Sequence, residues 1–325
     1  KTAYEIMPSL VGSEMCIRDR YQMANIDALR NSTPIEVEPL TKRLGARLHG
    51  VDCSDVDDET WSAVLAAFHT HHVLVFPDQD LTPDQHANFM ERFGLLDVHP
   101  QELSARTTLP LPENPKIELM LNKPGNYGPR AAAWHTDVTF RDEPVAVTSL
   151  YGVETPTACA DTIWTSMQAV FDDLTDGLKT TLRGLNAVHA TAFVMGDKGK
   201  AGQDSYDPTE ETDPKKMNLK AQYREEVIHP VVHRHEAGYE TLYVNPAFVH
   251  RIEGWSKEES DALLGLIYKR ATLANYTYRH RWTSRDLVVW DNRCTMHFGV
   301  NDYGEADRRI LHRTTGAPFK VHASR

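Results

Sequence analysis

The chain has 325 residues, of which 41% are hydrophobic, and a formal net charge of −11. A chain of this length and apolar content can bury a sizeable core, and its negative charge disfavours binding to nucleic acid or to an anionic membrane surface. No stretch approaches the roughly 18 consecutive apolar residues that a membrane-spanning helix needs. An anionic ligand would therefore need a local cluster of basic side chains that opposes the overall charge.

The four cysteines, at positions 16, 53, 159 and 294, are widely spaced and form no CxxC motif. They are too few for a disulfide scaffold, and their spacing matches no zinc finger. We therefore expect reduced thiols and a cytoplasmic location. Self-association into a homo-oligomer stays open.

The first twenty residues, KTAYEIMPSLVGSEMCIRDR, differ in character from the rest. They lack the basic start and the long apolar stretch of a signal peptide. We interpret residues 1–20 as a non-native leader and expect residues 21–325 to form a single domain.

The predicted elements begin with a strand at IEVEPL and a helix from Asp58 to His69, whose apolar residues share one face. HVLVFP predicts a short buried strand. Thr82 and Pro83 are typical of a helix start, and Gly94 of its end. Later helices are expected over residues 167–182 and after Ser256, where Glu259 would complete a capping box.

Strand-like segments predominate from Glu118 onward: ELML, VAVTSLYGVE, DTIWTS, VIHPVVHRH, ETLYVN, YTYRHRW, DLVVWDN and RRILHRTT. Many strands with few helices predict a mainly β fold, a double-stranded β-helix (jelly roll) with flanking helices. Residues 195–224 are polar and rich in Gly, Pro, Asp and Lys. This composition favours an exposed loop, with an active-site lid as the alternative.

The segment AAWHTDVTF places His135 and Asp137 two residues apart, so that on a strand both side chains would leave by the same face. His297, in WDNRCTMH, offers a third ligand. Two histidines and one carboxylate on one face of an octahedron suit ferrous iron with open positions. H-x-D alone is a weak signal, because a surface histidine beside a turn aspartate gives the same pattern.

Four motifs in this order, WHTDVTF, DTIWTSM, WDNRCTMH and RRILHRTT, closely resemble the taurine dioxygenase/TfdA family of Fe(II)- and 2-oxoglutarate-dependent dioxygenases. The resemblance runs from about Ile35 to Phe319. It implies roles for seven residues: iron ligands His135, Asp137 and His297; Thr162 and Arg309 for the distal carboxylate of 2-oxoglutarate; His99 and Arg313 for the substrate. It also implies O2 as a cosubstrate.

The residues at the positions expected to bind the substrate differ from those of the taurine enzymes. Arg130 and Ala131 stand approximately where those enzymes have an Asp and an Asn, and Glu102 replaces a tyrosine. The segment between His297 and Arg309 is one residue longer than in the taurine enzymes, so Arg309 is assigned by the motif RRILHR and not by counting. We therefore expect a small anionic substrate other than taurine, an alkyl sulfonate or sulfate ester, with an aryloxyalkanoate as the alternative.

Other interpretations of these residues remain. The three ligands would also suit a zinc hydrolase or a cupin-type isomerase, and the fold alone a non-catalytic small-acid binding module. The arginines at 308, 309 and 313 could be solvated charges, which we prefer for Arg308. Arg309 and Arg313 share a strand face that Arg308 does not. His229, His233 and His235 are expected to be structural or exposed.

Overall fold

The computed structural model describes residues 35–98, 108–122, 133–190, 226–304 and 306–324. The predicted leader, residues 1–20, and the polar segment 195–224, interpreted as an exposed loop or a lid, lie outside these residues. The helices are α2 (Asp58–His71), α3 (Pro83–Glu91), α4 (Met167–Asp172), α5 (Asp176–Arg183), α7 (Lys257–Ala271) and the short 3-10 helix η4 (Ala274–Tyr276). The strands are β1 (Glu36–Pro39), β2 (Ala46–His49), β3 (Val73–Phe76), β4 (Thr108–Pro110), β5 (Glu118–Asn122), β6 (Val145–Glu154), β7 (Thr162–Ser166), β8 (Asn186–His189), β9 (Val227–Pro230), β10 (Val232–Arg234), β11 (Glu240–Leu242), β12 (Val249–Ile252), β13 (Thr277–His280), β14 (Leu287–Asp291), β15 (Thr295–Gly299) and β16 (Arg309–Pro318).

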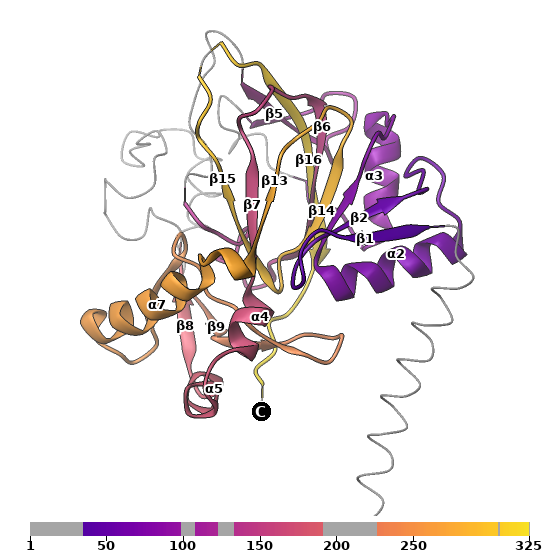
Figure 1. Cartoon of the computed structure of the whole chain (residues 1–325). Coiled ribbons are helices and arrows are strands. Elements are labelled where there is room, and N and C mark those ends of the chain that lie inside the picture. Colours follow the sequence, from indigo (N-terminus) through magenta and orange to yellow (C-terminus); the bar gives the residue numbers. More distant parts are fainter. Residues whose placement is uncertain (1–34, 99–107, 123–132, 191–225, 305, 325) are drawn as a thin grey trace, which may run out of the picture.

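The described chain is mainly β, as the sequence predicts (Figure 1). The largest sheet has the strand order β1-β2-β3-β14-β6-β16-β5-β4, and three smaller sheets have the orders β13-β7-β15, β12-β8-β9 and β10-β11. In the largest sheet the strands pair antiparallel except for β2 with β3. Strands far apart in sequence thus become neighbours, which is how β16 comes to lie between β5 and β6.

The large sheet is covered on both faces, and strand β3 shows why. Leu74 and Phe76 belong to an apolar cluster that includes residues of α2 and α3. Val73 and Val75 belong to another, which includes Trp164 of β7. Because successive residues of a strand point to opposite faces, helices cover one face and the sheet containing β7 covers the other. A strand buried on both faces is apolar throughout, which explains the sequence VLVF.

Local signals set the helix ends. Ser256 forms the capping box that the sequence predicts, and the helix start predicted at Thr82 is also closed by a capping box, with Gln85. The single helix expected over residues 167–182 is wrong, because α4 and α5 are separate helices. Thr175 has extended backbone geometry at the start of α5 and precedes Asp176, a pair typical of a helix start.

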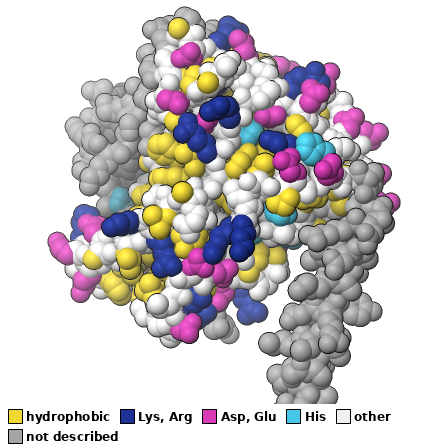
Figure 2. Space-filling view, in the orientation of Figure 1, with side chains coloured by type: hydrophobic (Ala, Val, Ile, Leu, Met, Phe, Trp, Pro, Cys, Tyr) yellow, Lys and Arg dark blue, Asp and Glu magenta, His cyan; other side chains and the backbone are white. Residues whose placement is uncertain are grey.

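On the face drawn in Figure 2, basic and acidic side chains are intermingled. No helix in the described ranges is both long and apolar enough to cross a bilayer.

Candidate functional site

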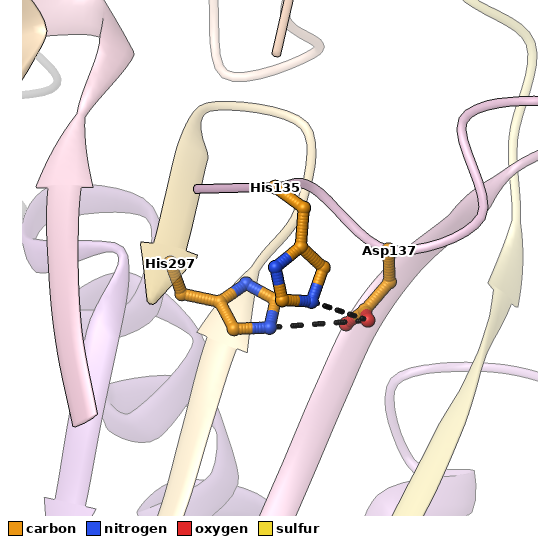
Figure 3. Close-up of side chains that lie close together, drawn as sticks. All are labelled: His135, Asp137 and His297. Atoms are coloured by element: carbon orange, nitrogen blue, oxygen red, sulfur yellow. Dashed lines mark ion pairs between the residues drawn. The ribbon is translucent and has the colours of Figure 1, made fainter. Parts of the chain in front are cut away.

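Two distant segments of the chain meet at the candidate site. His135 forms an isolated antiparallel bridge with His297 of β15; its N–H donates to the His297 carbonyl at 2.9 Å, and its carbonyl accepts from the His297 N–H at 2.7 Å. The strand expected around His135 and Asp137 is thus reduced to one bridge, because a turn begins at Asp137. The bridge still brings the two imidazoles together, with ring centroids 4.0 Å apart (Figure 3).

The turn after Asp137 has a strained backbone. Val138 has a φ of 45°, in the left-handed region that β-branched residues rarely adopt. The next residue, Thr139, is fixed by buried partners: its hydroxyl lies 2.9 Å from Nδ1 of His189 and accepts from Nδ2 of Asn245 at 3.0 Å. Strain of this kind persists where the surroundings impose it, and it is concentrated at functional sites.

The side chains of His135, Asp137 and His297 converge. Each offers one ligand atom, and these atoms all lie within 4.8 Å of one another. Oδ1 of Asp137 is 3.8 Å from Nε2 of His135 and 3.9 Å from Nε2 of His297 (Figure 3). Nδ1 of His135 lies 2.9 Å from the Ala133 carbonyl. Because a carbonyl only accepts, the ring proton belongs on Nδ1, which leaves Nε2 as a metal ligand.

A hydrogen-bond network fixes the second oxygen of Asp137. The Thr148 hydroxyl donates to Oδ2 of Asp137 at 2.8 Å and accepts from Nδ2 of Asn292 at 2.8 Å. Oδ1 of Asn292 accepts from the Trp290 indole at 3.1 Å and from the Asp137 N–H at 3.3 Å. Partners of this kind orient a ligating carboxylate.

Burial and charge set the protonation of two of these residues. Burial alone would raise the pKa of Asp137, but positive charge, first that of Arg313, lowers it well below its usual range. Burial lowers the pKa of His297 far below its usual value, and His135 adds to this effect. The results are a carboxylate and a neutral imidazole, which are the forms that bind metals.

Arg313 lies against the same carboxylate. Its Nη2 donates to Oδ1 of Asp137 at 2.8 Å, and its Nη1 donates to Oε2 of Glu118 at 3.0 Å. Burial by itself lowers the pKa of Arg313, whereas the two carboxylates raise it, and the net pKa is raised. The guanidinium predicted to hold the substrate is thus already in contact with two protein carboxylates.

Arg309 and Thr162 both border the segment that follows β15. Thr162 pairs with Gly299, and the Arg309 guanidinium lies 5.9 Å from the Tyr303 ring centroid. The Thr162 hydroxyl accepts a hydrogen bond from the Trp282 indole at 3.0 Å. Nε of Arg309 is buried without a hydrogen-bond partner in the described chain, and burial lowers the pKa of this group. An incompletely paired buried cation favours an anionic ligand at this position.

The structure therefore unites four of the seven predicted site residues: His135, Asp137, His297 and Arg313. Within the described residues, Thr162 and Arg309 make no hydrogen bond or ion pair with these four. His99 lies outside the described residues, as do Glu102, Arg130 and Ala131.

The residues interpreted as structural are mostly buried or solvated as expected. Arg308 is 53% exposed and pairs with Glu154 at 2.6 Å. The histidines at 229, 233 and 235 are all buried. His235 has a carboxylate partner that the spacing did not suggest, because its Nε2 lies 3.0 Å from Oδ2 of Asp291. Cys294 is a buried free thiol.

Sequence reasoning missed three residues of this site: Glu118, Thr148 and Asn292. A signal existed for two of them. Glu118 is a charged residue at the start of the otherwise apolar strand segment ELML, and Asn292 lies within the motif WDNRCTMH. Thr148 sits in the apolar strand β6, where threonine is ordinary, so nothing in the sequence distinguishes it.

We predict that Thr148→Val weakens metal binding by about 10–100-fold, the usual cost of losing an outer-shell partner. The substitution keeps the shape of the side chain but leaves Oδ2 of Asp137 and Nδ2 of Asn292 without their shared partner. Anaerobic Fe(II) titration of the purified protein measures the effect. Thr155→Val, at a half-buried threonine whose hydroxyl makes an exposed hydrogen bond with Ser284, is the matched control. Equal affinity in Thr148→Val and wild type would show that the network does not hold the carboxylate.

Comparisons with known proteins agree on one family. The model of the taurine catabolism dioxygenase TauD, TfdA family matches residues 36–315. An alpha-ketoglutarate-dependent sulfate ester dioxygenase from Pseudomonas putida is 33% identical over 283 residues, which cover 86% of this chain and 89% of that protein. An alkylsulfatase from Acinetobacter baylyi is 31% identical over 86% of this chain and 84% of its own length. A crystal structure of a taurine dioxygenase from Burkholderia xenovorans superposes with a TM-score of 0.70 at 29% identity, covering 89% of this chain and 93% of that one.

Proposed function

This chain belongs to the TauD/TfdA family of taurine catabolism dioxygenases, and we propose that it is an Fe(II)- and 2-oxoglutarate-dependent dioxygenase whose metal is held by His135, Asp137 and His297. The convergence of these three side chains, with ligand atoms within 4.8 Å, supports the proposal most directly. We also propose that the facing sheets form the double-stranded β-helix typical of the family. The packing of β7, through Trp164, against one face of the large sheet supports this fold.

The donor set fits ferrous iron. Two neutral imidazoles and one carboxylate on one side of a metal leave positions open for a bidentate cosubstrate and O2. When bound, the iron and 2-oxoglutarate supply the oxidation of a substrate C–H bond, coupled to the conversion of 2-oxoglutarate to succinate and CO2. The chain's own part is to hold this group: Ala133 fixes the proton of His135, and Thr148 orients Asp137.

Arg309 and Thr162 are proposed to hold the distal carboxylate of 2-oxoglutarate. Nε of Arg309, which is buried without a hydrogen-bond partner among the described residues, supports this role, since a guanidinium binds a carboxylate through two parallel hydrogen bonds. The Thr162 hydroxyl can donate to the same carboxylate while it accepts from Trp282. A zinc hydrolase gives no role to this pair, and a non-catalytic small-acid binding module would not require the three metal ligands.

For the substrate we propose an alkyl sulfate ester or alkyl sulfonate, bound with its anionic group near Arg313. Two relatives are named for sulfate ester oxidation and alkylsulfatase activity, which supports this class. Hydroxylation of the carbon next to the ester oxygen gives a hemiacetal sulfate. This product breaks its C–O bond while the hydroxyl proton passes to the departing sulfate, which gives an aldehyde and hydrogen sulfate.

We predict that alkyl sulfates and sulfonates outperform taurine by at least about tenfold in kcat/KM. The reason is that the residues expected to bind a substrate amine in the taurine enzymes are replaced in this chain at positions 102, 130 and 131. The measurement is competition between hexyl sulfate, hexanesulfonate, a phenoxypropionate and taurine at equal concentration, scored by specific product. A phenoxypropionate that wins would favour the aryloxyalkanoate alternative. Taurine ahead by tenfold would contradict the assignment of the substrate end.

Anaerobic Fe(II) titration with 2-oxoglutarate tests the reaction class itself. Only a dioxygenase of this kind should give a visible metal-to-ligand charge-transfer band, because 2-oxoglutarate must bind the iron directly. A protein that binds Zn(II) more tightly than Fe(II), shows no band and consumes no O2 would support the hydrolase or isomerase alternative. A protein that binds organic acids without any metal would support the binding module.

A further inference from the structure

Glu118 is held against Arg313 by the register of the sheet. Strands β5 and β16 pair antiparallel with Glu118 directly opposite Arg313 and Asn122 opposite Arg309. Directly opposed residues project from the same face of a sheet at close range. The ion pair of 3.0 Å between Oε2 of Glu118 and Nη1 of Arg313 is therefore built into the strand pairing. Glu118 is only 5% exposed, so water screens this charge weakly.

The positive charge of the Arg313 guanidinium is thus already balanced by protein carboxylates before any substrate binds. Its two terminal nitrogens donate to Asp137 and Glu118, while its side chain remains 20% exposed. A guanidinium has five N–H groups, so donors remain for a third acceptor. An anionic head group can therefore still bind there, but it would lie close to a buried carboxylate of the same sign.

We propose that Glu118 is a specificity-determining residue that limits the charge of the head group accepted beside Arg313, so that monoanions are favoured over dianions. This inference rests on the proposed function, in which Arg313 receives the substrate's anionic group. Repulsion from Glu118 acts on every anion, and by Coulomb's law it acts twice as strongly on a charge of −2 as on a charge of −1. A sulfate monoester or a sulfonate carries a single charge, whereas a phosphate monoester carries nearly two at pH 8. The two classes have similar shape, so charge is the main difference that the site can use.

The experiment compares hexyl sulfate with hexyl phosphate, which differ in head-group charge. Calorimetry at pH 8 under anaerobic conditions measures both dissociation constants for the protein loaded with Fe(II) and 2-oxoglutarate. We expect the wild-type protein to prefer hexyl sulfate. In Glu118→Gln both ligands should bind more tightly and the preference should fall by about tenfold or more, because the dianion gains more from loss of the carboxylate. Glutamine keeps the length of the side chain and an oxygen for Arg313, so a purely positional role predicts an unchanged preference.

Glu154→Gln is the matched control, since it removes the same charge from β6, on the other side of β16, at an exposed pair with Arg308. It should leave the preference at the wild-type value. Glu118→Met is a second neutral variant, suited to an apolar strand, in case Glu118→Gln does not fold. An unchanged preference in either folded variant, with the charge-transfer band intact, overturns this inference alone. The absence of that band in the wild-type protein overturns the proposed function instead.

Discussion

Asp137→Ala is expected to abolish coupled turnover and to reduce Fe(II) affinity by more than the ~10–100-fold that the loss of an outer-shell partner costs. Three observations point to this residue. Its Oδ1 lies 3.8 Å and 3.9 Å from the two imidazole nitrogens, and it alone of the three proposed ligands has a negative charge. Its low pKa keeps that charge in place even in acidic buffer.

The readouts are the iron content after anaerobic loading and the succinate formed per substrate oxidised. Asp137→Asn keeps the shape and removes the charge, which preserves the test should the alanine variant fold poorly. Asp142→Ala, at an exposed aspartate five positions along the same segment, is the control. Wild-type iron affinity and turnover in both Asp137 variants would refute the proposed metal centre.

The local parts of the site could be predicted from the sequence because they depend on residues close together in the chain. His135 and Asp137 are two residues apart, and His297 follows a strongly apolar strand. The helix starts at Thr82 and Ser256 follow from capping residues that act within one turn. The same local rules misled at 167–182, where the Thr175 start signal divides the expected helix.

The rest depends on strand pairing, which sequence periodicity does not determine. Arg313 reaches Asp137 across 176 positions, and Glu118 across 195, only because β16 lies between β5 and β6. A prediction from residue spacing could place Arg309 and Arg313 on one face of a strand, but it could not show which acids stand opposite them. The register that pairs Arg313 with Glu118 places Arg309 opposite the neutral Asn122. This difference in partners suggests different roles for the two arginines.

Arg309→Ala is expected to raise the dissociation constant of 2-oxoglutarate by at least about 30-fold, since removing one partner of a buried charged pair costs roughly 2–5 kcal/mol. The buried Nε without a partner in the described chain indicates that this guanidinium is arranged for a ligand rather than for a protein carboxylate. Arg313→Ala should act differently. It should weaken hexyl sulfate binding and, through the lost contact with Asp137, lower iron affinity, while 2-oxoglutarate affinity at saturating Fe(II) stays within a few-fold of wild type.

The charge-transfer band, titrated with 2-oxoglutarate at saturating Fe(II) without O2, measures the cosubstrate directly and does not depend on knowing the substrate. Arg308→Ala is the matched control, because this neighbouring side chain is 53% exposed and pairs with Glu154 on the surface. Its 2-oxoglutarate affinity should equal that of wild type, since an exposed ion pair contributes at most about 1 kcal/mol and lies outside the site. If Arg313→Ala rather than Arg309→Ala lost its affinity for 2-oxoglutarate, the proposed roles of the two guanidiniums would have to be reversed. The substrate anion would then have to bind near Asn122, at the opposite end of the β5–β16 pairing from Glu118.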